Sequence, residues 1–455
     1  MEKDQLFSTV IEDMSEQGEG IGRVDGYTLF IKDALTGDAV TGKVIKAKKN
    51  YGYGKLISVD VPSVHRVPAA CPIAAPCGGC QLMALSYEQQ LAFKQKKVKD
   101  HLERIGGFEE GTYLLRPITG AEEQFRYRNK AQYPLGRAKD GRIVYGFYAG
   151  RTHSIIETDD CLICSGINGK IMSVITDFMT EYGIGPYDEA SRSGLVRHVL
   201  IRRSMADGGT MVCIVANGKG LPREQQLCKR LAAIEGVVSV SLNINTRDTN
   251  VIMGQEMRHL YGTRCITEQV GDLKFNISPQ SFFQVNTAQT KVLYDTVLEL
   301  AGLTGSENVW DLYCGTGTIG LYLARHAAAV TGVEAVPSAV IDARGNARLN
   351  GIDNARFIMG KAEEVLTEYH EQGSCAHADV IVADPPRAGC DGALLKTILD
   401  MAPEKMVYVS CSSATLARDL KVLCEKDYEL RIVQPVDMIP HCTGVETVSL
   451  LKRRV

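Results

Sequence analysis

A single cysteine in the carboxyl-terminal part of the chain stands where a nucleophile would be activated. Cys411 follows an apolar run at residues 406–409 and precedes a segment that Ser413 or Thr415 can open as a helix. The run predicts a buried strand, so the thiol would lie between a strand end and a helix N-terminus. The helix dipole favours a thiolate there, which suits nucleophilic catalysis. The alternative is a small buried hydrophobe, and position alone favours that alternative.

Two carboxylates could serve the chemistry of such a thiol. Glu446 precedes the last predicted strand; near Cys411 it could act as a general base, although such a residue is usually a surface carboxylate. Asp384 follows an apolar run at residues 380–383 and opens an Asp-Pro-Pro-Arg motif. That motif is typical of methyltransferases that use S-adenosylmethionine. Amino-group methyltransferases usually carry an aromatic residue in the place of Arg387, which points away from amino methylation.

A glycine-rich turn upstream predicts a nucleotide-cofactor site. Residues 309–320 read as strand, glycine turn and helix, and the glycines allow a ligand close to the backbone. A second predicted strand ends in Glu334, about 20 residues on, as a ribose-binding acid requires. NAD would also satisfy this arrangement, but the Asp-Pro-Pro-Arg motif argues against NAD. The preceding segment, residues 277–286, could be no more than the cap and core of a following helix.

A second chemical signal is a cluster of cysteines in the first third of the chain. Cys71, Cys77 and Cys80 form a C-x5-C-x2-C pattern with two glycines between the last two thiols. The glycines let the loop fold closely around a ligand, and Cys161 or Cys164 can supply a fourth thiolate. Four thiolates suit either Zn²⁺ or a 4Fe–4S cluster, and the spacing does not decide between them. A radical S-adenosylmethionine cluster usually has a different spacing and is disfavoured.

The elements that precede these sites begin with closely spaced strands. Short alternating runs separated by glycine turns, notably at residues 18–22, predict a small antiparallel barrel of the OB type. The runs are residues 8–11, 27–31, 38–46 and 54–59. Basic and aromatic residues interleave at Lys43, Lys46, Lys48, Lys49, Tyr51, Tyr53 and Lys55. These residues suit an RNA surface, although lysines also protect an ordinary sheet edge. The segment resembles the TRAM domain, an RNA-binding barrel, in its glycine turn and its Gly37-Asp38 pair.

A basic helix and several hairpins follow the barrel. We predict a helix at residues 87–105, stopped by glycines at 106–107, with Lys94, Lys96, Lys97 and Lys99 on its polar side. Interleaved arginines and aromatics at residues 125–133 would hold an RNA strand or form the basic face of a half-buried strand. Asp140-Gly141 predicts a hairpin turn.

The whole pattern predicts three domains, because 455 residues exceed what one core usually serves. The first is an all-β barrel, the second an α+β domain that holds the cysteine cluster, and the third a Rossmann-like α/β domain of the class I methyltransferase type. Their predicted ranges are 1–62, 63–270 and 271–455.

The composition narrows the class of protein further. A net charge of −3 excludes a uniformly basic nucleic-acid binder but allows local basic surfaces. The polar N-terminus and the lack of a long apolar run predict neither a signal peptide nor a membrane span. Fourteen cysteines without a secretion signal favour reduced thiols used for metal binding or catalysis, in the cytoplasm.

Taken together, five motifs make the chain resemble the RNA uracil-C5 methyltransferase family. With the TRAM-like start and the cysteine cluster it is similar to the iron–sulfur branch that modifies uridines in 23S ribosomal RNA. The motifs are S-P-Q-S-F-F-Q-V-N at 278–286, D-L-Y-C-G-T-G-T at 311–318, D-P-P-R at 384–387, V-S-C-S-S-A-T-L-A-R-D at 409–419 and V-E-T-V at 445–448.

The resemblance implies a role for each matching residue. It makes Cys411 the nucleophile and Glu446 the base, and leaves Cys164 outside the metal site. The implied cluster ligands are Cys71, Cys77, Cys80 and Cys161, and the implied cofactor-binding residues are Gln284, Tyr313, Glu334 and Asp384. Two positions depart from the family pattern: Ser412-Ser413 stands where Asn-Pro or Asp-Pro often follows the nucleophile, and Gly444 where a histidine often precedes Val-Glu.

The implied reaction is methylation of uracil carbon 5 through a covalent Cys411 adduct at carbon 6, with Glu446 removing the carbon 5 proton. The implied cofactors are S-adenosylmethionine and a 4Fe–4S cluster, and the expected partner is RNA, with 23S ribosomal RNA as substrate. We expect a monomer without membrane association. The same chemistry on transfer RNA, or a non-catalytic RNA-binding protein, are the alternatives.

Overall fold

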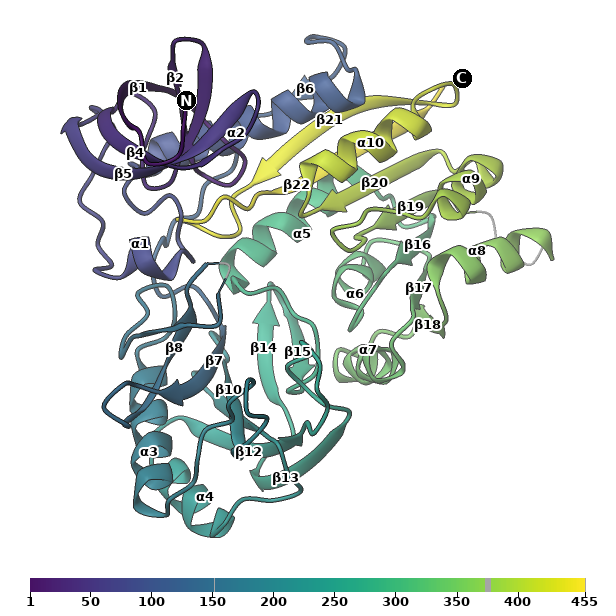
Figure 1. The fold of residues 1–455 in the computed structure, drawn as a ribbon. Helices are drawn as coiled ribbons and strands as arrows, with labels where there is room; N and C mark the ends of the chain where they lie inside the picture. The colour runs from purple at the N-terminus through teal and green to yellow at the C-terminus, as the bar shows by residue number, and fades with distance from the viewer. Residues whose placement is uncertain (151, 373–377, 455) are drawn as a thin grey trace.

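The computed structural model describes residues 1–150, 152–372 and 378–454. A small barrel, a mixed sheet with two helices and a large twisted sheet follow one another along the chain (Figure 1). The predicted fold class, with an N-terminal barrel and a doubly wound carboxyl-terminal sheet, is confirmed. Within the described residues, no helix has both the length and the apolar character needed to cross a membrane.

The barrel closes in the strand order β1-β2-β3-β5-β4, and only the β3–β5 pair is parallel. Its strands are β1 (Leu6–Met14), β2 (Gly20–Val24), β3 (Tyr27–Ile31), β4 (Ala39–Ala47) and β5 (Tyr51–Val61). The prediction of a glycine turn at residues 18–22 was wrong in part, because β2 begins at Gly20. A Cβ on Gly22 would lie 2.5 Å from Thr9 Cγ2, so glycine is required there by close strand packing.

The second sheet has the order β13-β12-β11-β10-β7-β8-β9, and its helices α3 and α4 pack on one face. The β7–β8 hairpin turns at Gly141, as predicted, where φ is 88°. The elements are β7 (Lys130–Arg137), β8 (Ile143–Tyr148), β9 (Ile155–Glu157), α3 (Ile167–Glu181), β10 (Val196–Arg203), β11 (Thr210–Ala216), α4 (Glu224–Ala232), β12 (Val237–Ile244) and β13 (Glu256–Gly262). A short α1 (Ala74–Cys77) lies in the cysteine loop, and the hairpin β14 (Ile266–Val270) and β15 (Leu273–Ile277) leads to the third sheet.

The third sheet has the order β18-β17-β16-β19-β20-β22-β21-β6, parallel except for β22, which runs against both of its neighbours. One face packs on α5, α6 and α7, and the other packs on α8, α9, α10 and α2. Its elements are α5 (Thr287–Ala301), β16 (Asn308–Leu312), α6 (Thr318–Ala324), β17 (Ala329–Glu334), α7 (Pro337–Leu349), β18 (Ala355–Met359), α8 (Ala362–Glu371), β19 (Val380–Ala383), α9 (Gly392–Met401), β20 (Lys405–Ser410), α10 (Ser413–Leu423), β21 (Tyr428–Val436) and β22 (Glu446–Arg453).

The basic helix after the barrel packs on this third sheet. α2 (Tyr87–His101) continues as the π-helical turn η1 (Leu102–Gly106), and both contact α10; β6 (Leu114–Leu115) joins the edge beside β21. The placement of Lys94 on the polar side was wrong: its side chain is fully buried and pairs with Asp437 at 2.5 Å. A buried carboxylate compensates the ammonium, which helical periodicity cannot reveal.

The ranges 1–62, 63–270 and 271–455 stay predictions, although α2 and β6 show that the range 63–270 also contributes to the third sheet.

Candidate active site

The residues chosen for their chemistry gather at one edge of the third sheet. Tyr313 follows β16, Glu334 ends β17, Asp384 follows β19 and Cys411 follows β20. These strands are parallel, so their carboxyl ends meet at the same edge. Glu446 reaches this edge because it is the first residue of the antiparallel strand β22, where Thr447 pairs with Ser410. In Figure 1, β20 points toward the side on which the barrel and α1 lie.

The glycine-rich turn after β16 has the form of a cofactor cradle. Tyr313 and Gly315 adopt left-handed φ values of 62° and 54°, and no atom lies within 4 Å of the position a Cβ on Gly315 would occupy. Glu334 is held beside this open backbone, since its carboxylate accepts hydrogen bonds from Gly315 N at 3.0 Å and Val336 N at 2.7 Å. The predicted ribose-binding acid and the predicted turn are therefore neighbours.

The segment that carries Gln284 crosses between the turn and the second sheet. Its backbone oxygen at Gln284 accepts a hydrogen bond from Asn129 Nδ2 at 2.9 Å. On the other side, Ser281 Oγ donates to Asp342 of α7 at 2.7 Å, and Thr316 Oγ1 of the glycine turn donates to Phe282 O at 3.5 Å. The segment is thus more than a helix cap, because it connects the cofactor turn with the second sheet.

The turn that bears Cys411 is held on both sides. Ser412 N donates to Ser410 Oγ, and Ser410 Oγ donates to Ser412 O, both at 3.1 Å. The buried Ser413 Oγ lies 2.8 Å from His101 Nδ1 of α2, and His101 Nε2 lies 2.6 Å from the carboxylate of Glu16, between β1 and β2. Hydrogen bonds therefore tie the predicted nucleophile turn to the barrel through α2.

Burial and neighbouring charges raise the pKa values of the carboxyl groups at this edge toward neutral pH. Burial and the neighbouring Asp384 carboxylate, opposed by the charge of Arg387, together raise the pKa of Glu446 to about 8. Burial likewise raises the pKa of Asp384 to about 7. The carboxylate of Asp311 accepts a hydrogen bond from Gly320 N, and burial raises the pKa of Asp311 to about 8. Carboxylates of this kind can accept or hold a proton near neutral pH, as a general base must.

The Cys411 thiol is subject to opposing influences. Burial raises its pKa, and the carboxylates of Glu446 and Asp384 raise it further. Arg387 lowers the pKa of the thiol by its charge and by a hydrogen bond to the sulfur. Arg387 was not predicted to be a site residue. The signal was its position directly after Asp-Pro-Pro, which was interpreted only as the absence of an aromatic ring.

We expect Arg387→Met to raise the pKa of Cys411, because the variant removes the cation that favours the thiolate. The pH dependence of alkylation by iodoacetamide, followed at Cys411 by mass spectrometry, should move to higher pH. Arg264→Met, which removes an exposed arginine elsewhere, is the matched control and should leave the profile unchanged. An unaltered profile in the Arg387 variant would contradict the assigned contact.

The predicted cluster cysteines lie around a common pocket. Cys71, Cys77, Cys80 and Cys161 line it together with apolar side chains such as Phe147. Two further thiols touch this group: Cys164 hydrogen-bonds to Cys161, and Cys442, which the sequence did not single out, hydrogen-bonds to Cys80. In the part of the chain that the structure describes, no three cysteine, histidine or acidic side chains converge closely enough to hold a single metal ion.

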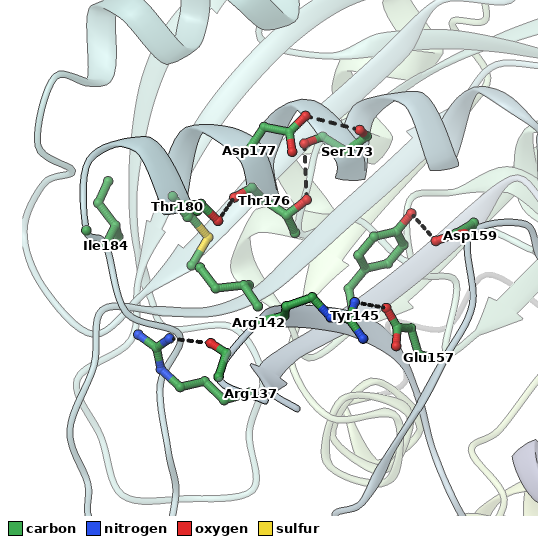
Figure 2. Close-up of a pocket in the computed structure, with 14 residues that line it drawn as sticks. Arg137, Arg142, Tyr145, Glu157, Asp159, Ser173, Thr176, Asp177, Thr180 and Ile184 are labelled. Carbon is green, nitrogen blue, oxygen red and sulfur yellow. Dashed lines mark hydrogen bonds and ion pairs between the residues drawn. The ribbon is translucent and has the colours of Figure 1, made fainter. Parts of the chain in front are cut away.

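A separate pocket lies beside the second sheet, between α3 and the β7–β8 hairpin (Figure 2). Its charged side chains have partners within the pocket: Arg142 Nη1 pairs with Glu157 at 3.2 Å, and Tyr145 donates to Asp159 at 3.5 Å. None of its lining residues comes from the third sheet. This pocket is therefore distinct from the candidate active site.

Comparisons with known proteins agree with this geometry. Residues 225–454 match the sequence model of a family described as tRNA (uracil-5-)-methyltransferase, and residues 10–57 match the TRAM domain. A Halalkalibacterium halodurans protein named as an uncharacterized RNA methyltransferase is 49% identical over 451 residues, which are 99% of this chain and 97% of that protein. A Clostridium tetani protein with the same description is 44% identical, over 99% of this chain and 97% of its own.

One solved structure is similar along almost the whole chain. It is that of the tRNA (uracil-54, C5)-methyltransferase of Pyrococcus abyssi in complex with S-adenosyl-L-homocysteine. The TM-score is 0.79 and the sequence identity 28%, over 98% of this chain and 100% of that chain. The similarity thus includes the barrel and both larger sheets.

Proposed function

We propose, from the premise that the chain belongs to the family of tRNA (uracil-5-)-methyltransferases and carries a TRAM domain, that it methylates carbon 5 of a uridine in 23S ribosomal RNA. Its family makes it an S-adenosylmethionine-dependent RNA methyltransferase. The observation that carries the proposed mechanism is the meeting of Cys411 and Glu446, from adjacent strands, at the cofactor edge of the sheet.

The backbone at Gly315 and four side chains support a site for the cofactor. The open backbone at Gly315 admits a ligand, and Glu334 beside it can accept hydrogen bonds from ribose hydroxyls. We propose that Gln284, Tyr313 and Asp384 complete this site, with Asp384 between cofactor and uracil. S-adenosylmethionine, when bound there, supplies the methyl group.

The two catalytic residues act on the uracil ring. Carbon 5 of uracil is a weak nucleophile, so the Cys411 thiolate adds to carbon 6 and moves electron density to carbon 5 and oxygen 4. Carbon 5 then takes the methyl carbon from S-adenosylmethionine, and the electron pair of the broken methyl–sulfur bond stays on the sulfur of the leaving S-adenosylhomocysteine. Glu446 takes the proton from carbon 5, and the electron pair of that bond expels the Cys411 thiolate and restores the ring. The target uridine must leave its stack to reach the thiol.

We propose that Cys71, Cys77, Cys80 and Cys161 hold a 4Fe–4S cluster with a structural role. Their common pocket and all-sulfur donor set fit such a group. A single Zn²⁺ would need four thiolates at about 2.3 Å from one point, whereas a cluster holds its thiolates farther apart. The lack of single-ion geometry among the described residues is compatible with the cluster.

We expect Cys77→Ser and Cys80→Ser to yield colourless protein with little bound iron and a thermal midpoint lower by several degrees, since metal binding contributes to folding. Absorbance, iron content and calorimetry provide the measurements. Cys265→Ser, a half-buried cysteine elsewhere, is the control and should keep the iron. Stoichiometric zinc in the wild-type protein, or unchanged iron in both variants, would overturn the proposal.

Transfer RNA is the second candidate substrate, because the Pyrococcus abyssi protein that matches 98% of this chain is a tRNA methyltransferase. Mapping 5-methyluridine in 23S ribosomal RNA and in transfer RNA, from cells with and without the gene, tests both. We expect one or more ribosomal sites to lose the modification in the deletion strain. Loss confined to transfer RNA selects the second candidate, and loss from neither refutes both.

We further propose that the protein is a cytoplasmic monomer without membrane association.

A further inference from the structure

Two cations face each other across neighbouring strands of the second sheet. Lys130 begins β7 and Arg202 lies near the end of β10, and they are direct partners in the antiparallel register. Side chains in this relation project from the same face with Cβ atoms about 4.5–5.5 Å apart, so like charges there repel. The repulsion between Lys130 and Arg202 therefore destabilises the protein when nothing is bound.

The face that carries the pair looks toward the cofactor domain. The alternate residues of the two strands, including Ala131, Tyr133 and Ile201, pack in the core with α3 and α4. Lys130 and Arg202 therefore project from the opposite face, where Arg202 Nη2 donates to Ser281 O. Asn129 fixes the same region by its bond to Gln284 O. The two cations thus lie beside the segment that connects the second sheet with the cofactor turn.

No carboxylate compensates these charges among residues 1–150, 152–372 and 378–454. Neither Lys130, Arg202 nor the neighbouring Arg128 has an ion pair there, and Arg202 Nε has no hydrogen-bond partner although Arg202 is only 2% exposed. Burial and the charges of Arg202 and Arg128 together lower the pKa of Lys130 to about 8.

Two other cations with little exposure are each paired with a carboxylate. Lys94 pairs with Asp437 at 2.5 Å, and Arg66 pairs with the buried Asp38 at 2.5 Å. Burying a charge without a partner is costly, so such sites are usually paired or bind an ion of opposite sign. Lys130 and the two neighbouring arginines together have the composition of an anion site.

We infer that Lys130 and Arg128, which are both partly exposed, bind a backbone phosphate of the RNA substrate, and that the buried Arg202 adds its positive charge from behind. The inference rests on the proposed function, which makes RNA the partner of this face. Lysine and arginine both bind phosphate, the former as a point charge and the latter through directed N–H groups. Phe282, which is 67% exposed, stands on the same segment as Ser281, and an exposed ring beside cations is typical of single-strand binding.

A salt titration of RNA binding tests the site. The probe is a fluorescein-labelled oligouridine, followed by anisotropy against wild type, Lys130→Met and Lys130→Arg. Loss of one phosphate contact should weaken binding by about tenfold at low salt and reduce the slope of log K against log salt by about 0.7. Lys130→Arg should keep most of the affinity. Lys229→Met, an exposed lysine on α4 at the opposite face, is the matched control.

Thermal stability separates a phosphate site from a structural lysine. Because Lys130→Met removes repulsion from Arg202 and Arg128, its thermal midpoint without RNA should be equal to or higher than that of wild type. A structural lysine would lower the midpoint. A variant that is both more stable and weaker in RNA binding is the expected result.

The cofactor carboxylate is the other anion that this region could meet. Titration calorimetry with S-adenosylhomocysteine should give the same affinity for wild type and Lys130→Met. Weaker cofactor binding with unchanged RNA binding, or an unchanged salt slope, would overturn the inference. Uridine mapping tests the reaction and this titration tests the phosphate contact, so either can fail while the other succeeds.

Discussion

Cys411→Ala should lower the methylation rate by at least about 10⁴-fold, as removal of a covalent nucleophile does in other enzymes. The thiol is the only group at the β20–α10 turn that we expect to add to carbon 6. RNA and cofactor affinities should stay close to those of wild type, because Cys411 is half-buried and the turn is held by Ser410 and His101. Single-turnover transfer of a labelled methyl group, together with binding titrations, provides the measurement.

The matched control is Cys424→Ala, which removes another half-buried thiol at the far end of α10. It should retain near wild-type turnover. A Cys411 variant that still methylates uridine at a comparable rate would exclude the covalent mechanism. A variant that loses RNA binding together with turnover would instead indicate that Cys411 maintains the shape of the site.

Glu446→Gln should slow product formation by about 10²- to 10⁴-fold, the usual contribution of a general base. The methylated adduct with Cys411 should accumulate, since elimination needs the carbon 5 proton to leave. A band of protein linked to RNA on a denaturing gel, labelled from the methyl donor, would report it. Glu425→Gln, an exposed carboxylate beyond α10, should form no such band.

The pH dependence gives Glu446 a second test. Burial raises its pKa to about 8, and only the deprotonated carboxylate can accept a proton. Adduct breakdown in the wild type should therefore rise with pH up to about 8 and then level off, and this dependence should vanish in Glu446→Gln. Adduct breakdown by the glutamine variant at the wild-type rate would assign the base to another residue.

Hydrogen bonds connect the barrel, α2 and the turn that carries Cys411, so the proposed RNA-binding domain is linked to the proposed catalytic residue. Glu16 of the barrel, His101 of α2 and Ser413 of α10 form one hydrogen-bonded chain. The barrel also approaches the loop before Glu446, since a Cβ on Gly18 would lie 3.1 Å from Thr443 Cγ2. The barrel therefore helps to position the turn that carries Cys411, through α2, and the loop before Glu446, through its approach to Thr443.

The sequence alone determined the order and type of the elements at the candidate site. Glu334, Asp384 and Cys411 each end an apolar run, and parallel strands bring such ends to one edge whatever surrounds them. The hairpin turn at Gly141 and the helix start after Asn286 could also be predicted from the sequence. Backbone periodicity and turn chemistry are local properties, so the sequence reports them directly.

Only the tertiary structure decided which side chains meet across long separations. Lys94 lies on a helix whose pattern predicted solvent, yet it pairs with Asp437, 343 positions later. Arg387 acquires its influence on Cys411 because a loop after β19 lies beside the turn after β20. Lys130 faces Arg202 through strand register. Such pairings depend on how distant elements pack, and packing energy is shared over the whole core, so no local pattern carries them.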